Sequence, residues 1–358
     1  MEDITPEKII VLKQKIDPEG MLDIAYNSNS QIEEILRISD IWELPDFSPK
    51  NILICGLGGS AIGGDLVRAI MEKEIKVPVI MCRDYNIPGF VDKDTLCLCI
   101  SYSGNTEETL SAYRHCKERG AMIIAVSTDG KIREMASQDN VCFCQVPAGY
   151  QPRAALALSF CAQLLIFMKM KLVKDYRRDL QKSAAFLEKL SNKWSDWKTP
   201  GDNPPLSLAM NLIGKIPAIF GSTGFLGTMA YRWKCQFNEN TKMLALYGVI
   251  PEMDHNEIVG WHNREEFYKD KYIVFLRDQK ESPRIKARVD FTVELLSKIA
   301  PVQEVYPEGE NDLEKLFYFV LYGDLVSIYL AYFYDKDPSE IDSIHWLKKK
   351  LAESNVLI

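Results

Sequence analysis

The sequence predicts an α/β protein with two domains, each built on a mainly parallel sheet flanked by helices. Short apolar runs of strand character alternate with helical stretches along most of the chain, a pattern typical of parallel sheets covered on both faces. A length of 358 residues also favours two domains. The composition is that of an ordinary globular protein, with 47% hydrophobic and 26% charged residues.

Changes in this alternating rhythm divide the chain into five predicted segments. Helical spacing of apolar residues marks the start, where Ile9, Leu12 and Ile16 recur on one face. The turn-rich stretch TPGDNPP marks a hinge near the middle. The predicted segments are an N-terminal helical extension (1–48), a first α/β domain (49–170), a helical connector and hinge (171–204), a second α/β domain (205–335) and a C-terminal helical tail (336–358).

Charge and hydropathy exclude several classes of protein. The net charge of -7 argues against a general nucleic-acid binder, which needs basic surfaces to neutralise phosphates. The first residues carry acids and have no apolar core of a signal peptide, so we expect a cytoplasmic protein. The apolar stretches 154–168 and 316–334 contain polar residues, Asp324 among them. We therefore predict core helices and no membrane partner.

The nine cysteines do not have the spacing of a metal site or a disulfide framework. The pairs Cys97/Cys99 and Cys142/Cys144 lie in strand-like runs, so each pair faces one side of a strand. No pair of CxxC motifs is present, and the histidines are not clustered with the cysteines. We expect buried thiols in a reducing compartment and no metal.

The first motif is GLGGSAIGGD, residues 56–65, directly after the strand-like run NILIC. Glycines between a strand and a helix let backbone N–H groups approach an anion, and here they include Gly58 and Gly59, followed by Ser60. A nicotinamide site is disfavoured, because the glycine spacing departs from G-x-G-x-x-G and no acidic residue ends the next strand. A substrate-binding loop is favoured over a tight turn with close helix packing.

The second motif is SYSGNTEET, residues 101–109, after the strand-like run TLCLCI. Ser101, Ser103 and Thr106 supply three hydroxyls around a glycine turn, and a helix follows. A helix N-terminus adds unpaired N–H donors and a positive dipole, which suit a phosphate monoester. The alternative is a plain N-cap with a capping box. One hydroxyl would suffice for a cap, so three at the carboxyl end of a strand favour phosphate.

Together with QPRAAL, FNEN and DHNEIVGW further on, these motifs resemble the sugar-isomerase (SIS) family, and specifically the bifunctional phosphoglucose/phosphomannose isomerases. The resemblance runs from about residue 51 to the C-terminus. It implies two SIS-type domains and an aldose–ketose isomerisation of glucose 6-phosphate, and of mannose 6-phosphate, to fructose 6-phosphate through a cis-enediolate. It also implies a homodimer and no cofactor.

The resemblance assigns roles to residues outside the two loops. It makes Glu239 the base that moves a proton between the first two sugar carbons, and it places Arg153 beside the developing negative charge. It makes His255, supplied by the partner subunit, and Lys348 the groups that open the sugar ring. Where the family has a threonine tied to acceptance of mannose, this chain has Ser339.

Without the resemblance these residues would have ordinary interpretations. Arg153 would form a surface ion pair at a helix start, Glu239 would be solvated, His255 would be structural and Lys348 would belong to a solvated helix end. Two alternative functions stay open: a sugar-phosphate-binding regulatory protein that has lost the base, and an isomerase for another phosphosugar.

Overall fold

The computed structural model describes residues 6–195, 197 and 202–354. The predicted hinge residues 199–201 lie outside the described residues. The chain forms two compact units. One, here the first-sheet unit, comprises Ser28–Ala184 and Leu351–Ile358, and the other, the second-sheet unit, comprises Met1–Asn27 and Ala185–Lys350. The five segment boundaries drawn from the sequence stay a prediction.

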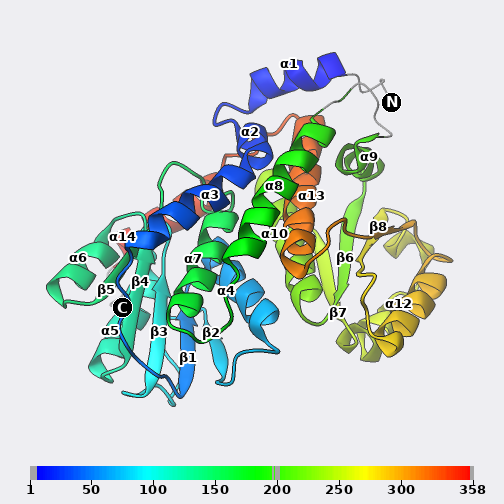
Figure 1. The fold of residues 1–358 in the computed structure, drawn as a ribbon. Coiled ribbons are helices and arrows are strands. Elements are labelled where there is room, and N and C mark those ends of the chain that lie inside the picture. Colours follow the sequence, from blue (N-terminus) through cyan, green and yellow to red (C-terminus); the bar gives the residue numbers. More distant parts are fainter. Residues whose placement is uncertain (1–5, 196, 198–201, 355–358) are drawn as a thin grey trace. The chain divides into compact units, whose positions relative to one another are not determined.

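The first-sheet unit contains a parallel sheet in the order β2-β1-β3-β4-β5 (Figure 1). Each predicted apolar run forms its strand, and β3 is buried along its whole length. Five parallel strands paired in register leave all their carboxyl ends at one edge, where ligands of such sheets bind. The strands are β1 (Asn51–Cys55), β2 (Val79–Cys82), β3 (Thr95–Ile100), β4 (Met122–Ser127) and β5 (Cys142–Gln145).

Helices pack on this sheet because alternate strand residues point to opposite faces. On one face, side chains of β1, β3 and β4 form a core with α5 and α6. The helix α4 contacts β1 and β2, α7 packs on α4, and α3 packs on α7. The helices are α3 (Ser28–Ile38), the short η1 (Ser39–Ile41), α4 (Gly58–Met71), α5 (Glu107–Glu118), α6 (Lys131–Gln138) and α7 (Leu156–Lys169).

The second-sheet unit contains a parallel sheet in the order β7-β6-β8-β9. Here too the predicted apolar runs form strands, and β6 coincides with the run IPAIFGS. The strand order repeats that of the first sheet without its last strand, so β8 takes the position that β3 has there. The strands are β6 (Ile216–Ser222), β7 (Leu246–Ile250), β8 (Lys271–Leu276) and β9 (Val302–Val305).

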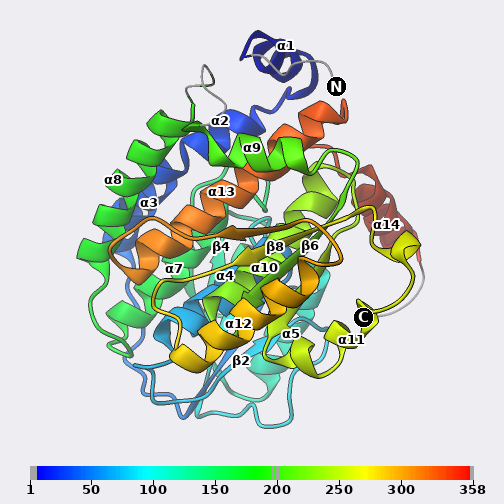
Figure 2. The same cartoon turned by 90° about the vertical axis from the view of Figure 1, so that its right-hand side faces the viewer.

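The second sheet is also flanked by helices (Figure 2). α12 closes a core on one face, α10 packs on β6 and β7, and α13 packs on α10. The helices of this unit are α1 (Pro6–Ile16), α2 (Met21–Tyr26), α9 (Pro204–Asn211), α10 (Phe225–Asn240), η3 (Glu252–His255), α11 (Glu257–Gly260), η4 (Glu265–Phe267), α12 (Pro283–Leu296), α13 (Asp312–Phe333) and most of α14 (Asp342–Glu353). The connector predicted between the domains contains α8 (Arg177–Trp194), which runs from one unit into the other.

Pro204 and Pro205, predicted as part of a hinge, instead open α9, because proline suits a first helical turn and the Asn203 side chain accepts a hydrogen bond from Leu206 N at 3.0 Å.

α13 is apolar and long enough to span a membrane by length and composition, but 89% of its apolar window is buried inside the protein. It is a core helix, as the sequence predicts.

Candidate active site

A pair of hydroxyls lies in the loop between β3 and α5. Ser101 Oγ and Thr106 Oγ1 are 2.8 Å apart, and Thr106 N donates to Ser101 Oγ at 3.3 Å. Thr106 occupies the N-cap position of α5, yet its side chain makes no capping hydrogen bond. A plain cap therefore does not account for this hydroxyl. Ser103 is exposed in the same loop, so all three predicted hydroxyls lie in the segment that ends at the N-cap of α5.

The shape of this loop depends on Gly104. Its φ of 72° lies in the left-handed region that glycine enters freely. A β-carbon at this position would also lie 1.7 Å from the carbonyl oxygen of Asp129. The Asn105 side chain fastens the turn further, since it donates to Ser103 O at 2.9 Å and accepts from Lys131 N at 3.2 Å. The hydroxyls are thus held by a turn packed on the next loop of the sheet.

The glycine motif after β1 is more helical than the sequence suggests. α4 begins at Gly58, so most of the predicted loop forms the first turns of a helix with no side-chain cap at its start. The motif lies against the other site segments. A β-carbon on Gly56 would be 3.0 Å from the Ile100 carbonyl oxygen, and one on Gly59 would be 2.7 Å from that of Pro152. Ser60 is buried at this junction.

Arg153 lies in the turn before α7, not in the first helical turn that the sequence suggests, since α7 begins at Leu156. Its side chain is only 4% exposed, so a surface ion pair does not describe it. The backbone of residues 152 and 153 packs on Gly59, as the distance above shows. Arg153 therefore belongs to the same unit and the same cluster of segments as Ser60, Ser101, Ser103 and Thr106.

Sequence reasoning missed Tyr102, which lies between two of the predicted hydroxyls. Its hydroxyl donates to Pro147 O at 3.0 Å and accepts from Tyr150 N at 3.2 Å. Burial raises the pKa of Tyr102 to about 12, which keeps the phenol protonated at neutral pH. Tyr102 thus ties the hydroxyl loop to the segment that leads to Arg153. Its place inside the motif was the only available signal.

Glu239 lies in the last turn of α10, as predicted, and this helix is fastened to α13 by a buried polar seam. Arg232 Nη2 donates to both carboxylate oxygens of Asp324, at 2.7 and 2.9 Å. Gln236 Nε2 donates to the same carboxylate at 2.6 Å, and Asn240 Nδ2 donates to Ser327 Oγ at 2.9 Å. The donors follow helical spacing, so the seam fixes both the rotation and the axial position of the helix that carries Glu239.

A pocket of about 400 Å³ opens beside Glu239 within the second-sheet unit. The end of α10 and the residues that follow it form one wall, and residues 340–344, which include the first turn of α14, form the other. Ser339 immediately precedes this wall and is buried, with its N and Oγ donating to Asp337 Oδ1 at 2.7 and 2.6 Å. Pockets of this size hold small molecules.

The remaining predicted residues of this unit lie outside that pocket. His255 is exposed at the end of η3, which is held on α12 by the Asp254 carboxylate accepting from Arg288 and Thr292. Lys348 is exposed on α14 and is not among the residues that line the pocket. The structure therefore groups Glu239 with the segment after Ser339, and it leaves His255 and Lys348 on the surface.

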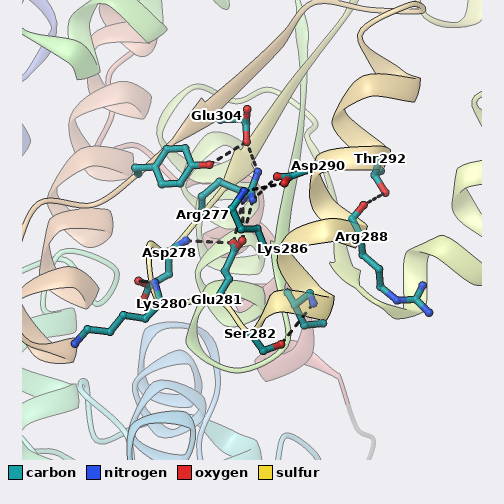
Figure 3. A network of polar contacts seen from close by, with 12 residues as sticks. Arg277, Asp278, Lys280, Glu281, Ser282, Lys286, Arg288, Asp290, Thr292 and Glu304 are labelled. Carbon is teal, nitrogen blue, oxygen red and sulfur yellow. Dashed lines mark hydrogen bonds and ion pairs between the residues drawn. The ribbon is translucent and has the colours of Figure 1, made fainter.

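The loop after β8 occupies the place in the second sheet that the loop with Ser101 and Thr106 has in the first, and it contains a network of ion pairs (Figure 3). The buried Arg277 donates to Glu281 Oε2 at 2.9 Å and to Asp290 Oδ1 at 2.8 Å, and it also pairs with Glu304. Asp278 N donates to Glu281 at 3.2 Å. Burial alone would lower the pKa of Arg277, but these carboxylates raise it. Donors at this position are thus taken by the chain's own carboxylates.

Five cysteines gather in the core of the first-sheet unit, on the face covered by α5. Cys55 lies in register with Cys82 on one side and with Cys99 on the other. All nine cysteines are free thiols. Among the described residues, no group of three or more His, Cys, Asp or Glu side chains is arranged to hold a metal ion.

Comparison with known proteins assigns both halves of the chain. The SIS domain family matches residues 47–170, and the family described as bacterial phospho-glucose isomerase C-terminal SIS domain matches residues 201–351. A solved structure, a hypothetical protein from Thermus thermophilus, shares the fold with a TM-score of 0.74 over 97% of this chain and 94% of that chain at 15% identity. The predicted pair of SIS-type domains is confirmed.

Two curated relatives align over most of the chain. The bifunctional phosphoglucose/phosphomannose isomerase of Caldicellulosiruptor bescii is 40% identical, over 93% of this chain and 99% of the relative. The protein of the same name from Aquifex aeolicus is 35% identical, over 87% of this chain and 94% of the relative. Identity at this level over nearly full length goes well beyond a shared fold. The chain belongs to the bifunctional phosphoglucose/phosphomannose isomerase family.

Proposed function

We propose that this protein is an aldose–ketose isomerase that interconverts glucose 6-phosphate and mannose 6-phosphate with fructose 6-phosphate. The relatives with which it aligns along nearly its whole length carry the name of that activity. The observation within the chain that carries the proposal is the hydroxyl pair Ser101–Thr106 at the N-terminus of α5. It is a site for a phosphate monoester that needs no fixed cation.

The phosphate would bind to the hydroxyls of Ser60, Ser101, Ser103 and Thr106 and to the backbone N–H groups at Gly58 and Gly59. Both helices that begin here, α4 and α5, lack a side-chain cap. Their first N–H groups therefore keep hydrogen-bonding capacity, and their dipoles favour a dianion. The phosphate group is common to all three substrates and serves as the anchor.

The proton transfer is assigned to Glu239. Its carboxylate would remove the proton from C2 of the open aldose, the C1 carbonyl oxygen would take up the electron pair, and a cis-enediolate would form. The hydroxyl proton on O2 then passes to O1, and return of the carbon-bound proton to C1, as O2 becomes the carbonyl oxygen, yields the ketose, so no hydride is lost and no net redox change occurs. Arg153 would stabilise the negative charge of the enediolate, as preorganised cations do in buried sites.

Ring opening is assigned to His255 and Lys348. Histidine suits proton transfer near neutral pH. Ser339 is assigned to the sugar-binding site on the resemblance, since it replaces the threonine that the family ties to acceptance of mannose and keeps its hydroxyl. Mannose 6-phosphate is included among the substrates because both relatives are named phosphoglucose/phosphomannose isomerases.

We also propose that the enzyme is a homodimer in which His255 acts on the partner's substrate. Exposed apolar side chains of the same unit support a protein interface: Leu244 is 79%, Leu246 43% and Val259 70% exposed. β7 is an edge strand of its sheet, and an exposed apolar edge invites pairing with another chain. The nine free thiols agree with the reducing cytoplasm that we propose as its compartment.

Replacing Glu239 by Gln tests the assignment of the base. The amide keeps the size of the side chain and removes its basicity. We expect isomerisation of fructose 6-phosphate, measured in a coupled assay, to be abolished while binding measured by calorimetry is nearly unchanged. Wild-type protein that binds fructose 6-phosphate without turnover would instead favour a regulatory protein. Preferential turnover of another phosphosugar in a competition assay would favour the second alternative.

Mixing two inactive variants tests the dimer. Glu239→Gln and His255→Ala subunits, refolded together, form mixed dimers in which one of the two sites has both an intact glutamate and an intact histidine. Activity should then return to about a quarter of the wild-type value if histidine acts in trans. No recovery, with mixed dimers present, would contradict the proposed trans arrangement.

A further inference from the structure

Lys242 follows α10 in a conformation that lysine seldom adopts. Its φ is 57°, in the left-handed region, where a β-carbon is disfavoured and glycine is the usual residue. Helices commonly end with glycine at this position for that reason. A lysine that accepts an unfavourable backbone conformation directly after the turn of Glu239 indicates that its side chain contributes something glycine cannot.

The Lys242 ammonium donates to three backbone carbonyls. It lies 2.9 Å from the carbonyl oxygen of Glu239, 3.3 Å from that of Asn240 and 2.5 Å from that of Asp337. The first two belong to the last turn of α10, whose carbonyls have no partner within the helix. A cation there also suits the negative end of the helix dipole. The third carbonyl belongs to a segment that is almost one hundred residues further along the chain.

This bridge joins the two walls of the pocket beside Glu239. On one side it fixes the turn that carries the carboxylate. On the other it fixes Asp337, whose carboxylate in turn accepts hydrogen bonds from the N–H and hydroxyl of Ser339. Lys242 itself lines the pocket with Glu239 and residues 340–344. The Lys242 ammonium thus links the turn of Glu239 directly to the segment that leads to Ser339.

We propose that Lys242 is a positioning residue of the isomerase, which holds the Glu239 turn at a set distance from the Ser339 segment. The inference rests on the proposed function, since it concerns the same base. The ammonium donates to three carbonyl oxygens of the chain, and the positioning role acts through these contacts. Its removal should therefore impair the chemical step more than the binding of the phosphate, which is assigned to the other unit.

Replacing Lys242 by Gly provides the test, because glycine adopts the same φ without strain and removes only the bridge. We expect kcat to fall by about tenfold or more, as for other displaced catalytic groups. KM for fructose 6-phosphate should change little, and the melting temperature should be equal or higher. Lys242→Arg, which restores a cation with several donors, should recover most of kcat.

Lys171 offers a matched control. It follows α7 with a φ of 58° and is likewise an exposed lysine, but it lies in the first-sheet unit. Lys171→Gly should leave kcat and KM unchanged. Absence of activity in the wild type would refute the proposed function itself. With an active wild type, the positioning role is overturned if Lys242→Gly keeps full kcat, or if its kcat falls only in step with a lowered melting temperature.

Discussion

Substitution of Gly59 by Ala probes the junction at which the two halves of the proposed phosphate site meet. Gly59 lies in the first turn of α4, and a β-carbon there would be 2.7 Å from the carbonyl oxygen of Pro152 and 3.6 Å from the Cα of Arg153. Ordinary van der Waals contact begins at about 3.4 Å, which is 0.7 Å more than the 2.7 Å between this β-carbon and the Pro152 oxygen. The start of α4 and the segment of residues 152 and 153 would therefore have to move apart by 0.7 Å. Both partners are backbone, so no side chain can turn away.

The size of the effect follows from that displacement. Overpacking of this kind costs about 1–3 kcal/mol of stability. The larger consequence concerns the site, because the same movement separates the N–H groups of α4 from Arg153. A misplacement near 1 Å can reduce a rate by about 100-fold, so we expect kcat/KM for fructose 6-phosphate to fall by about 10- to 100-fold. Both KM and kcat should contribute, since anchoring and charge stabilisation are disturbed together.

Initial rates over a range of fructose 6-phosphate concentrations, with a urea denaturation curve for each protein, measure both effects. Gly89→Ala is the control, since Gly89 has no left-handed φ and a β-carbon there would meet nothing within 4 Å. It should leave rate and stability unchanged. If Gly59→Ala kept the wild-type kcat/KM, the α4 start and the Arg153 segment would not act together, and the proposed arrangement of this site would be wrong.

Three further predictions concern other parts of the chain. Thr106→Val removes the hydroxyl that pairs with Ser101 while keeping the shape of the side chain. Because a hydrogen bond to a charged phosphate is lost, KM for the sugar phosphate should rise about tenfold or more in steady-state assays. An unchanged KM would contradict the proposal that this hydroxyl binds the phosphate. Asp324→Asn deprives the buried Arg232 of its carboxylate and should lower the free energy of unfolding in urea by about 3–5 kcal/mol; a loss below about 1 kcal/mol would show that the seam is dispensable. Hydrogen bonds from the neighbouring lysine and arginine lower the pKa of Asp290 in the folded protein. Asp290 therefore contributes its full stabilisation at pH values above the pKa of about 3.9 that an aspartate has in the unfolded chain. This stabilisation is lost as the pH falls through the lower pKa of the folded state. Urea midpoints at pH 7 and pH 3 should therefore differ less in Asp290→Asn than in wild type, and an equal difference would contradict this.

The strands could be predicted from the sequence because a buried parallel strand needs a continuous apolar run, and such runs as TLCLCI have few other interpretations. The error near Pro204 has a definite cause. The prolines and glycine of TPGDNPP indicate a turn, but proline is equally suited to the first turn of a helix, and Asn203, directly before the two prolines, is a preferred N-cap residue that favours the helix.

The place of the three candidate hydroxyls after β3 could be predicted, because chemistry requires particular residue types at the end of a strand, and their role stays a prediction. The site was not predictable where a role depends on contacts between distant segments. Tyr102 reaches residues 147 and 150, and Lys242 reaches Asp337. The place of Tyr102 inside the motif SYSGNTEET does not show what its hydroxyl contacts, and Lys242 belongs to none of the motifs singled out, because in both cases the partner segment is placed only by the folded chain.

The central claim is that hydroxyls after β3 anchor the phosphate while Glu239 moves a proton between the first two carbons of the sugar. A crystal structure of Glu239→Gln with fructose 6-phosphate bound tests it most directly. The account predicts the phosphate within hydrogen-bond distance of the Ser101 and Thr106 hydroxyls, and C1 and C2 in contact with the residue 239 side chain. A phosphate bound elsewhere, or a residue 239 side chain with no contact to either carbon, would contradict it.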